Sequence, residues 1–250
     1  MNKNLIFIIA INDPNRVIQN QDYAQYSLKT WEYWCKKNNC DLKVLTEDEV
    51  GLKFPIWNKE MIYKYGKGYD KIGIVDSDTM IRWDAPNIFD FIEEDKFYGV
   101  NDLCDLGWLL SSIRDRQKFF PTINLNIDKY INAGVLFFSS NALPLFERFL
   151  EFVKFNEEEI NAIDGGGKEQ TLLNFFIQMS MLEIELLEPS WNLLSIHKKN
   201  MFQFNWQLNQ NKTPYFINYA YIWHMTGFPI EDRVQVMKNT WEFIQNQYQI

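Results

Sequence analysis

The amino-acid sequence predicts an α/β fold, a Rossmann-like α/β/α sandwich in which helices cover a mixed, mostly parallel central sheet. Residues 5–11 form an apolar run rich in β-branched side chains, as expected for a strand that is buried on both faces. Segments with strand-like and helix-like patterns then alternate as far as residue 75. Such alternation is typical of parallel sheets with crossover helices, and ligands of these folds bind beyond the carboxyl ends of the strands.

The helix after the first strand is predicted from the spacing of its large side chains. A turn at residues 12–14 ends the strand. Bulky side chains then recur every three or four residues from Tyr23 to Trp34, which places them on one helical face. We therefore expect Trp31 and Trp34 to have a structural role in the core.

The same periodicities predict the remaining elements. Strands are expected at residues 42–45, 71–75, 97–100, 135–139 and 216–223, and helices at residues 55–65, 143–155, 169–178 and 234–248. Residues 163–167 contain three consecutive glycines and lack the Lys-Ser/Thr ending of a phosphate-binding P-loop, so we expect a flexible loop there. No linker or repeat divides the chain, which favours a single domain over residues 1–250.

The composition disfavours several classes of partner. A formal net charge of -8 argues against nucleic acid and anionic lipid, which select for clustered cations, and favours a small or neutral substrate. No stretch approaches the roughly 18–20 apolar residues that span a bilayer, and residues 1–11 fit a buried strand better than a signal peptide. The three cysteines lack a C-x-x-C spacing. We expect reduced thiols in a cytoplasmic protein whose membrane association, if any, is peripheral.

Two carboxylates follow the strand predicted at residues 71–75. Asp76 and Asp78 lie at its carboxyl end, with Ser77 between them. Mg²⁺ and Mn²⁺ bind carboxylate oxygens together with substrate phosphates, so this pair suits a diphosphate bridged by a metal ion. Acidic pairs are also common in solvated turns and helix caps, and the motif alone leaves that alternative open.

A histidine near the other end of the chain gives a second signal. His224 follows an apolar run and is one of only two histidines in the protein. Imidazole nitrogen is a common metal ligand, but a histidine beside a tryptophan is often a core residue with its hydrogen bonds satisfied. Both interpretations are open from this segment alone.

Taken in chain order, four motifs resemble those of the GT-A glycosyltransferases, and of glycosyltransferase family 8 with its glycogenin- and galactosyltransferase-like members in particular. The motifs are Asp76-Ser77-Asp78, Tyr130-Ile131-Asn132-Ala133-Gly134-Val135, Glu169-Gln170 and His224-Met225-Thr226-Gly227. The resemblance covers most of the chain. It implies a GT-A fold whose nucleotide-binding part spans about residues 1–100 and whose acceptor and sugar part spans about residues 101–250.

The resemblance also implies a role for each motif. Asp76, Asp78 and His224 would hold Mn²⁺ or Mg²⁺. The nucleotide-sugar donor, expected to be a UDP-sugar, would contact Ala10, Asn12, Asp13, Lys59, Asp76, Ser77, Asn132, Ala133, Gly134, Thr226 and Gly227. Sugar contacts and catalysis would fall to Asp102, Glu169 and Gln170, with Gln170 beside the anomeric carbon. Glu169 departs from the Asp that usually precedes this Gln.

Several of these residues also have simpler explanations. Lys59 suits a solvated helix face, Gly134 a strand bulge and Asp102 a loop carboxylate, while residues 12 and 13 make a good turn. Residues 108–126 lie where GT-A enzymes host acceptor loops. Their cations Arg114, Arg116 and Lys118 suit an acidic or phosphorylated acceptor, and equally an ordinary surface helix with solvated charges.

The reaction implied by the resemblance is transfer of a sugar to a hydroxyl of a glycan, lipid-linked or protein acceptor. It would proceed with retention, the leaving phosphate accepting the hydroxyl proton; an inverting reaction would instead need a carboxylate base near that hydroxyl. Two other functions are considered. A haloacid-dehalogenase-like phosphatase would use Asp76 and Asp78, although Met80 stands where its motif favours Thr or Val. A nucleotide-sugar-binding protein without turnover is the other.

Overall fold

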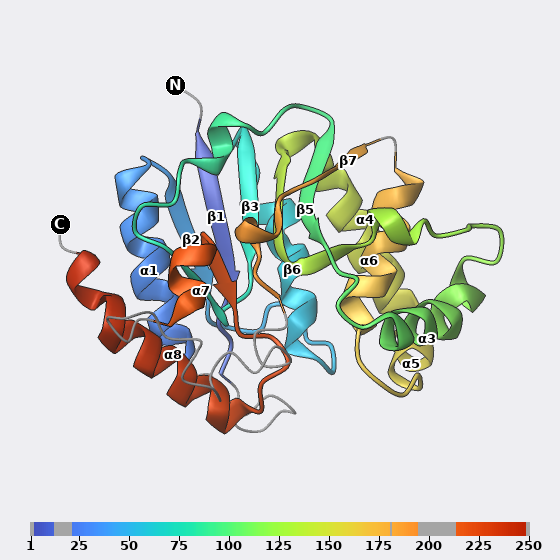
Figure 1. Cartoon of the computed structure of the whole chain (residues 1–250). Coiled ribbons are helices and arrows are strands. Elements are labelled where there is room, and N and C mark those ends of the chain that lie inside the picture. Colours follow the sequence, from blue (N-terminus) through green and yellow to red (C-terminus); the bar gives the residue numbers. More distant parts are fainter. Residues whose placement is uncertain (1–2, 13–21, 181, 195–213, 249–250) are drawn as a thin grey trace.

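The central feature of the computed structural model is a six-stranded sheet with strand order β2-β1-β3-β6-β5-β7 (Figure 1). Residues 3–12, 22–180, 182–194 and 214–248 are described. Only β6 runs antiparallel to its sheet neighbours, so the expected mixed, mostly parallel α/β architecture is confirmed. The strands are β1 (Asn4–Ile9), β2 (Asp41–Leu45), β3 (Lys71–Val75), β5 (Lys96–Asn101), β6 (Ile131–Ser139) and β7 (Glu183–Leu186).

A second, two-stranded sheet lies beyond the carboxyl end of β3. It pairs β4 (Thr79–Ile81) with β8 (Ile222–His224) in antiparallel orientation. In this register Thr79 lies opposite His224. The pairing therefore brings a segment near the end of the chain to the residues that directly follow β3.

Helices pack on both faces of the large sheet. They are α1 (Ala24–Lys37), α2 (Ile62–Tyr65), α3 (Leu106–Arg116), α4 (Leu143–Phe155), α5 (Glu157–Asn161), α6 (Lys168–Met179), α7 (Tyr215–Tyr219) and α8 (Ile230–Ile244). Short 3-10 helices occur at Pro55–Met61, Ile88–Asp90, Gln117–Phe119, Ile127–Lys129, Ser140–Ala142, Pro189–Trp191 and Gln245–Gln247. Figure 1 shows α8 running beside α1, with α3, α5 and α6 gathered at the other side of the molecule. Among the described residues no helix is long and apolar enough to cross a membrane.

The alternation of side chains along β1 explains the two cores. Leu5 and Phe7 belong to the core that includes the apolar faces of α4 and α6. Ile6 and Ile8 point to the opposite face and pack in the core that contains Trp31 and Trp34 of α1. Because successive strand residues point to opposite faces, one uniformly apolar strand serves both cores.

The tryptophans of α1 are structural, as expected, and they also support the turn after β3. Trp31 and Trp34 are fully buried. The Trp31 indole N–H donates to Thr79 Oγ1 at 3.0 Å, and that hydroxyl in turn donates to the carbonyl of Asp76 at 2.7 Å. The core of α1 is thus connected by hydrogen bonds to the Asp-x-Asp segment.

Two predicted elements were wrong in type or form. Residues 216–223 were expected as one strand, but α7 occupies Tyr215–Tyr219 and only Ile222–His224 is extended. Phe216, Ile217 and Ala220 are buried at one- and three-residue intervals, which suits a helical turn packed on the core rather than a strand. The helix expected at residues 55–65 is a 3-10 helix, Pro55–Met61, followed by the single turn of α2. The strands β4 and β7 and the short helix α5 were not predicted.

Gly73 in the middle of β3 should be sensitive to any added side chain. A Cβ there would lie 2.7 Å from Ile6 Cδ1 and 2.8 Å from the Phe137 ring, well inside van der Waals contact. We expect Gly73→Ala to lower the free energy of unfolding by about 1–3 kcal/mol in urea titrations, as overpacking does in other cores. Gly107→Ala, on the exposed start of α3 where the nearest atom is 3.6 Å away, should be neutral or slightly stabilising. Equal losses in the two variants would contradict this account of the sheet.

Candidate active site

The turn between β3 and β4 brings the two aspartates of the motif to one place. The backbone N–H of Thr79 donates to the Asp76 carbonyl at 3.0 Å, which closes the turn. His224 arrives from β8, with Nε2 3.2 Å from Asp78 Oδ1 and 3.9 Å from Asp76 Oδ2. One ligand atom from each of the three residues lies within 4.8 Å of the others. The structure thus assembles the trio Asp76, Asp78 and His224 expected from the sequence.

The trio fits a divalent cation. Two carboxylates and an imidazole offer the oxygen and nitrogen ligands that Mn²⁺ accepts, and Mg²⁺ also binds through one or two carboxylates with water and phosphate completing its shell. His224 and Asp78 are buried, whereas Asp76 is partly exposed and lines a cavity. Burial alone would raise the pKa of Asp78, but His224 and Arg233 hold that pKa well below its usual range. Asp78 is therefore available as an anionic ligand.

Gly134 on β6 leaves the space in which the trio sits. A Cβ on Gly134 would lie 2.3 Å from His224 Cε1 and 2.6 Å from Asp76 Oδ2. The ladder between β5 and β6 also loses its regular register in this stretch. Gly134 therefore fits both interpretations of the sequence. It lies in a stretch of β6 where the strand pairing is irregular, as in a bulge, and it lets the backbone of β6 approach the site.

Lys59 is a buried cation at the centre of the site, which excludes the alternative of a solvated helix face. Its side chain is 3% exposed, and its Nζ lies 2.8 Å from Asp76 Oδ1 and 3.3 Å from Glu169 Oε2. It also donates to the Ala133 carbonyl at 3.1 Å. Burial by itself would lower the pKa of Lys59, but the two carboxylates raise it above its usual value. Lys59 thus joins the metal trio to α6.

Glu169 carries an unsatisfied carboxyl oxygen beside the cavity. The residue is buried and lines the cavity, and its Oε1 has no hydrogen-bond partner among the described residues. Burial raises the pKa of Glu169 to about 7, against the attraction of Lys59, and the charge of Asp76 adds to the increase. A buried acceptor without a partner is costly unless a ligand satisfies it.

Asp102, Asn132 and Gln170 form one hydrogen-bonded group on the same side of the cavity. Asp102 Oδ2 accepts from Asn132 Nδ2 at 3.1 Å and from Gln170 Nε2 at 3.0 Å. Gln170 Oε1 accepts from Asn132 Nδ2 at 2.9 Å and from the Ala133 backbone N–H at 3.1 Å. Asp102 is therefore more than a loop carboxylate, because two side chains hold it in place.

Two adjoining cavities meet at Lys59 and Asp76. The larger has a volume of about 620 Å³, and its lining includes Asp102, Asn132, Gly134, Glu169, Gln170, His224, Thr226 and Gly227. The smaller, of about 140 Å³, is lined by Ile9, Ile11, Tyr23, Ser77, Asp78 and Arg233 among others. Ala10 and Asn12 adjoin this smaller cavity in sequence without lining it, and Asp13 lies outside the described residues.

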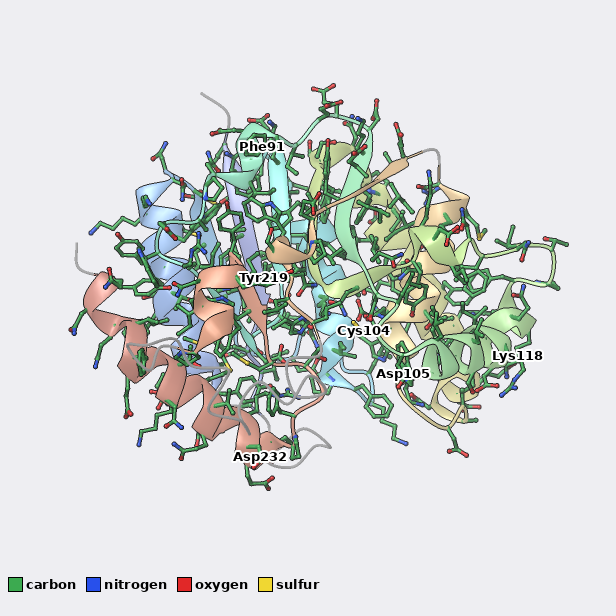
Figure 2. All side chains as sticks on the ribbon, viewed as in Figure 1. Phe91, Cys104, Asp105, Lys118, Tyr219 and Asp232 are labelled. Carbon is green, nitrogen blue, oxygen red and sulfur yellow. The ribbon has the colours of Figure 1, made fainter. Side chains whose placement is uncertain are left out.

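The segment expected to contact the acceptor divides into buried and exposed parts. Trp108, at the start of this segment, lines the large cavity together with Cys104 and Asp105, which precede it, and Figure 2 shows Cys104 and Asp105 near the centre of the view. Lys118 lies at the outer edge of the molecule in the same view and is exposed. Arg116 is buried and donates to the Gly166 carbonyl at 3.0 Å, so it contacts the glycine loop.

Two side chains of the site were missed in the sequence. Arg233, one turn into α8, has Nη1 3.1 Å from Asp78 Oδ2 and lies over the Tyr23 ring. Asn192 is fully buried against His224. Arg233 could have been found as a cation soon after Thr226 and Gly227, at the start of an amphipathic helix. No sequence signal distinguishes Asn192 from the other asparagines of the chain.

The fold and the position of the Asp-x-Asp turn define a class. A mixed sheet with one reversed strand, an Asp-x-Asp turn after β3 and a histidine from a second small sheet are consistent with the GT-A fold. Among solved structures, the chain is similar to a glycosyltransferase involved in the glycosylation of the major capsid of PBCV-1, with 13% identity, coverage of 95% of this chain and 99% of that chain, and a TM-score of 0.59.

Two further structures share this fold. One is the galactosyltransferase LgtC in complex with donor and acceptor sugar analogs, at 11% identity, covering 97% of this chain and 99% of that chain with a TM-score of 0.52. The other is the bifunctional glycosyltransferase WbbM, at 15% identity and a TM-score of 0.57, in which the match covers 99% of this chain and 52% of the other. The resemblance to GT-A glycosyltransferases expected from the sequence is confirmed at the level of the fold. The sequence itself matches no family model and no curated protein.

Gly134→Ala should weaken cation binding at the trio. The added methyl group would overlap His224 and Asp76, which both have to move for it to fit. In calorimetric titration with Mn²⁺ alone, we expect wild-type binding and at least about a tenfold loss of affinity in the variant, which corresponds to 1.4 kcal/mol. Gly107→Ala, at the exposed start of α3 where the nearest atom is 3.6 Å away, is the control for Mn²⁺ binding. Unchanged Mn²⁺ affinity in Gly134→Ala would place the cation elsewhere.

The raised pKa of Glu169 predicts a pH dependence of stability. Between the ordinary value of 4.5 and about 7 the folded state holds a proton that the unfolded state releases, so this group's contribution falls as pH rises through that window. Glu169→Gln removes the effect. We expect the free energy of unfolding of the variant, relative to wild type, to increase from about pH 5 to about pH 8 in urea titrations. The exposed residue Glu158, changed to Gln, should leave the wild-type pH profile unchanged. Parallel profiles for wild type and Glu169→Gln would contradict the shift.

Proposed function

We propose that this protein is a metal-dependent glycosyltransferase that moves a sugar from a nucleotide-sugar donor to an acceptor hydroxyl. The observation that carries the proposal is the Asp76, Asp78 and His224 trio at the junction of two cavities, in a chain with the GT-A fold. We further propose a UDP-sugar donor, a cytoplasmic setting and an acceptor that is a glycan, a lipid-linked molecule or a protein. The catalytic domain spans residues 1–250, with the nucleotide bound mainly by about residues 1–100.

The smaller cavity suits the nucleoside and the start of the diphosphate. Ser77 and Asp78 line one side of it, and Ile9, Ile11 and Tyr23 provide apolar and aromatic surface for a base. Ala10, Asn12 and Asp13 belong to the same end of the chain. A divalent cation bound by the trio would neutralise part of the negative charge of the diphosphate. Thr226 and Gly227, which follow His224 closely in the chain, line the larger cavity and suit the phosphate nearer the sugar.

The larger cavity suits the transferred sugar and the acceptor. Glu169 Oε1 offers an unused acceptor for a sugar hydroxyl. The polar side chains of Asp102 and Gln170, which are hydrogen-bonded to each other, line the same cavity. Trp108 provides an aromatic surface farther along the same cavity. The absence of a side chain on Gly134 allows close approach of the donor to β6. For the reaction itself we propose retention, with the leaving phosphate accepting the proton of the acceptor hydroxyl and Gln170 beside the anomeric carbon.

Nucleotide binding gives the first test. We expect UDP to bind the wild type with Mn²⁺ present, GDP to bind much more weakly, and Asp78→Asn to lose the metal-dependent part, as measured by calorimetry. Release of free sugar from a UDP-sugar, abolished by a chelator, would separate an enzyme from a binding protein without turnover. No binding of either nucleotide with Mn²⁺ present would refute the glycosyltransferase proposal and return attention to the phosphatase alternative.

Arg233 should have opposite effects on metal and nucleotide. Its guanidinium shares Asp78 with the cation site and faces the smaller cavity, where its Nε has no hydrogen-bond partner among the described residues. Hydrogen bonds to charged groups contribute about 1.5–3 kcal/mol, so Arg233→Gln should weaken UDP binding with Mn²⁺ by about tenfold or more. Affinity for Mn²⁺ alone should stay equal or rise, because a competing cation is removed from Asp78. Lys238→Gln, exposed on the same helix, should change neither affinity. Parallel losses of both affinities would show that Arg233 only supports the fold.

A further inference from the structure

Asn192 links His224 to β6 through two buried hydrogen bonds. The residue follows the 3-10 helix Pro189–Trp191 and is fully buried. Its Oδ1 lies 3.0 Å from Nδ1 of His224, and its Nδ2 donates to Asn132 Oδ1 at 3.0 Å. The neighbouring backbone is held beside β8, since the Leu193 N–H donates to the Ile222 carbonyl at 2.9 Å.

Backbone donors determine the orientation of every amide in this group. The Gly134 N–H can only donate, so the Asn132 atom that it contacts at 2.9 Å must be the oxygen. The Ala133 N–H in the same way requires Gln170 to present its oxygen, and that oxygen then faces the Asn132 amide nitrogen. Two independent backbone groups therefore agree on the orientation of Asn132.

The orientation passes from Asn132 to His224. Since Asn132 Oδ1 is an acceptor, Asn192 must turn its NH₂ group toward it. The Asn192 oxygen is then left facing Nδ1 of His224, and an amide oxygen can only accept. His224 must therefore carry a proton on Nδ1, and in the neutral ring this leaves the lone pair on Nε2, the nitrogen that faces Asp78 and Asp76.

We infer that Asn192 is a positioning residue for the metal site, which holds the His224 ring in the tautomer and orientation that lets Nε2 bind the cation. The inference rests on the proposed function, because it assumes that the trio binds a divalent metal. Partners that orient a ligating histidine typically change metal affinity by about 10- to 100-fold when removed. Asn192 acts through His224 and does not contact the cation itself.

Three variants separate positioning from general support of the fold. Asn192→Leu keeps the approximate volume but leaves Nδ1–H without an acceptor, whereas Asn192→Asp keeps an acceptor and places a buried charge opposite Asn132 Oδ1. Asn174→Leu is the matched control, because Asn174 is also fully buried and hydrogen-bonded to the Ile131 backbone without contacting His224. Calorimetry with Mn²⁺ alone measures metal affinity, and urea unfolding measures stability.

The expected order of affinities differs from the order of stabilities. Asn192→Leu should weaken Mn²⁺ binding by about 10- to 100-fold. Asn192→Asp should retain most of the wild-type affinity for Mn²⁺, even though its buried charge makes it less stable than Asn192→Leu. Asn174→Leu should lose stability and keep its Mn²⁺ affinity. Equal Mn²⁺ affinity in wild type and Asn192→Leu, or metal affinities that simply follow stability across the three variants, would overturn the inference.

The tautomer can also be observed without metal. The chain has only two histidines, His197 and His224, so nitrogen NMR of histidine-labelled protein at alkaline pH needs a single His197→Gln variant for assignment. We expect His224 to be protonated at Nδ1 in wild type and in Asn192→Asp, and to lose this preference in Asn192→Leu. A ring without a proton on Nδ1 in the wild type would refute the inference. If the wild type binds no Mn²⁺, the proposed function fails, and the NMR result still decides the role of Asn192.

Discussion

The site depends on one buried ammonium group. Lys59 is almost fully enclosed, and a cation in that position is tolerable only because Asp76, Glu169 and the Ala133 carbonyl surround it. These partners come from the turn after β3, from α6 and from β6. The ion pairs therefore hold together segments that have no local sequence relationship. They also set the position of Asp76, and through it the geometry of the trio.

Around Lys59, the site contains more carboxylates than cations. Asp76, Asp78 and Glu169 gather near two permanent cations, Lys59 and Arg233. Burial is the main cause of the raised pKa of Glu169, and repulsion from Asp76, which a proton on Glu169 relieves, adds to it. The divalent cation that we propose at the trio would be another means of relief, because it would compete with Arg233 for Asp78.

Buried amides connect the trio by hydrogen bonds to Asp102 and Gln170, which line the larger cavity. Backbone N–H groups of β6 orient Asn132 and Gln170, and these hold Asp102 on one side and Asn192 on the other. Since each amide has one donating and one accepting end, fixing one end fixes the next. A glycine at position 134 is part of the same arrangement, because it lets β6 approach the trio closely.

Local sequence patterns determined the elements, and the tertiary structure decided how they meet. The apolar run of β1, the helical spacing of Trp31 and Trp34 and the acidic turn at Asp76 were readable because each depends on neighbours a few residues away. The strand predicted at residues 216–223 failed, since packing of Phe216 and Ile217 overrode the local pattern. The burial of Lys59, the pairing of Arg233 with Asp78 and the contact of Asn192 with His224 were not readable. They arise from the register between β4 and β8 and from packing between distant segments, which periodicity along the chain does not encode.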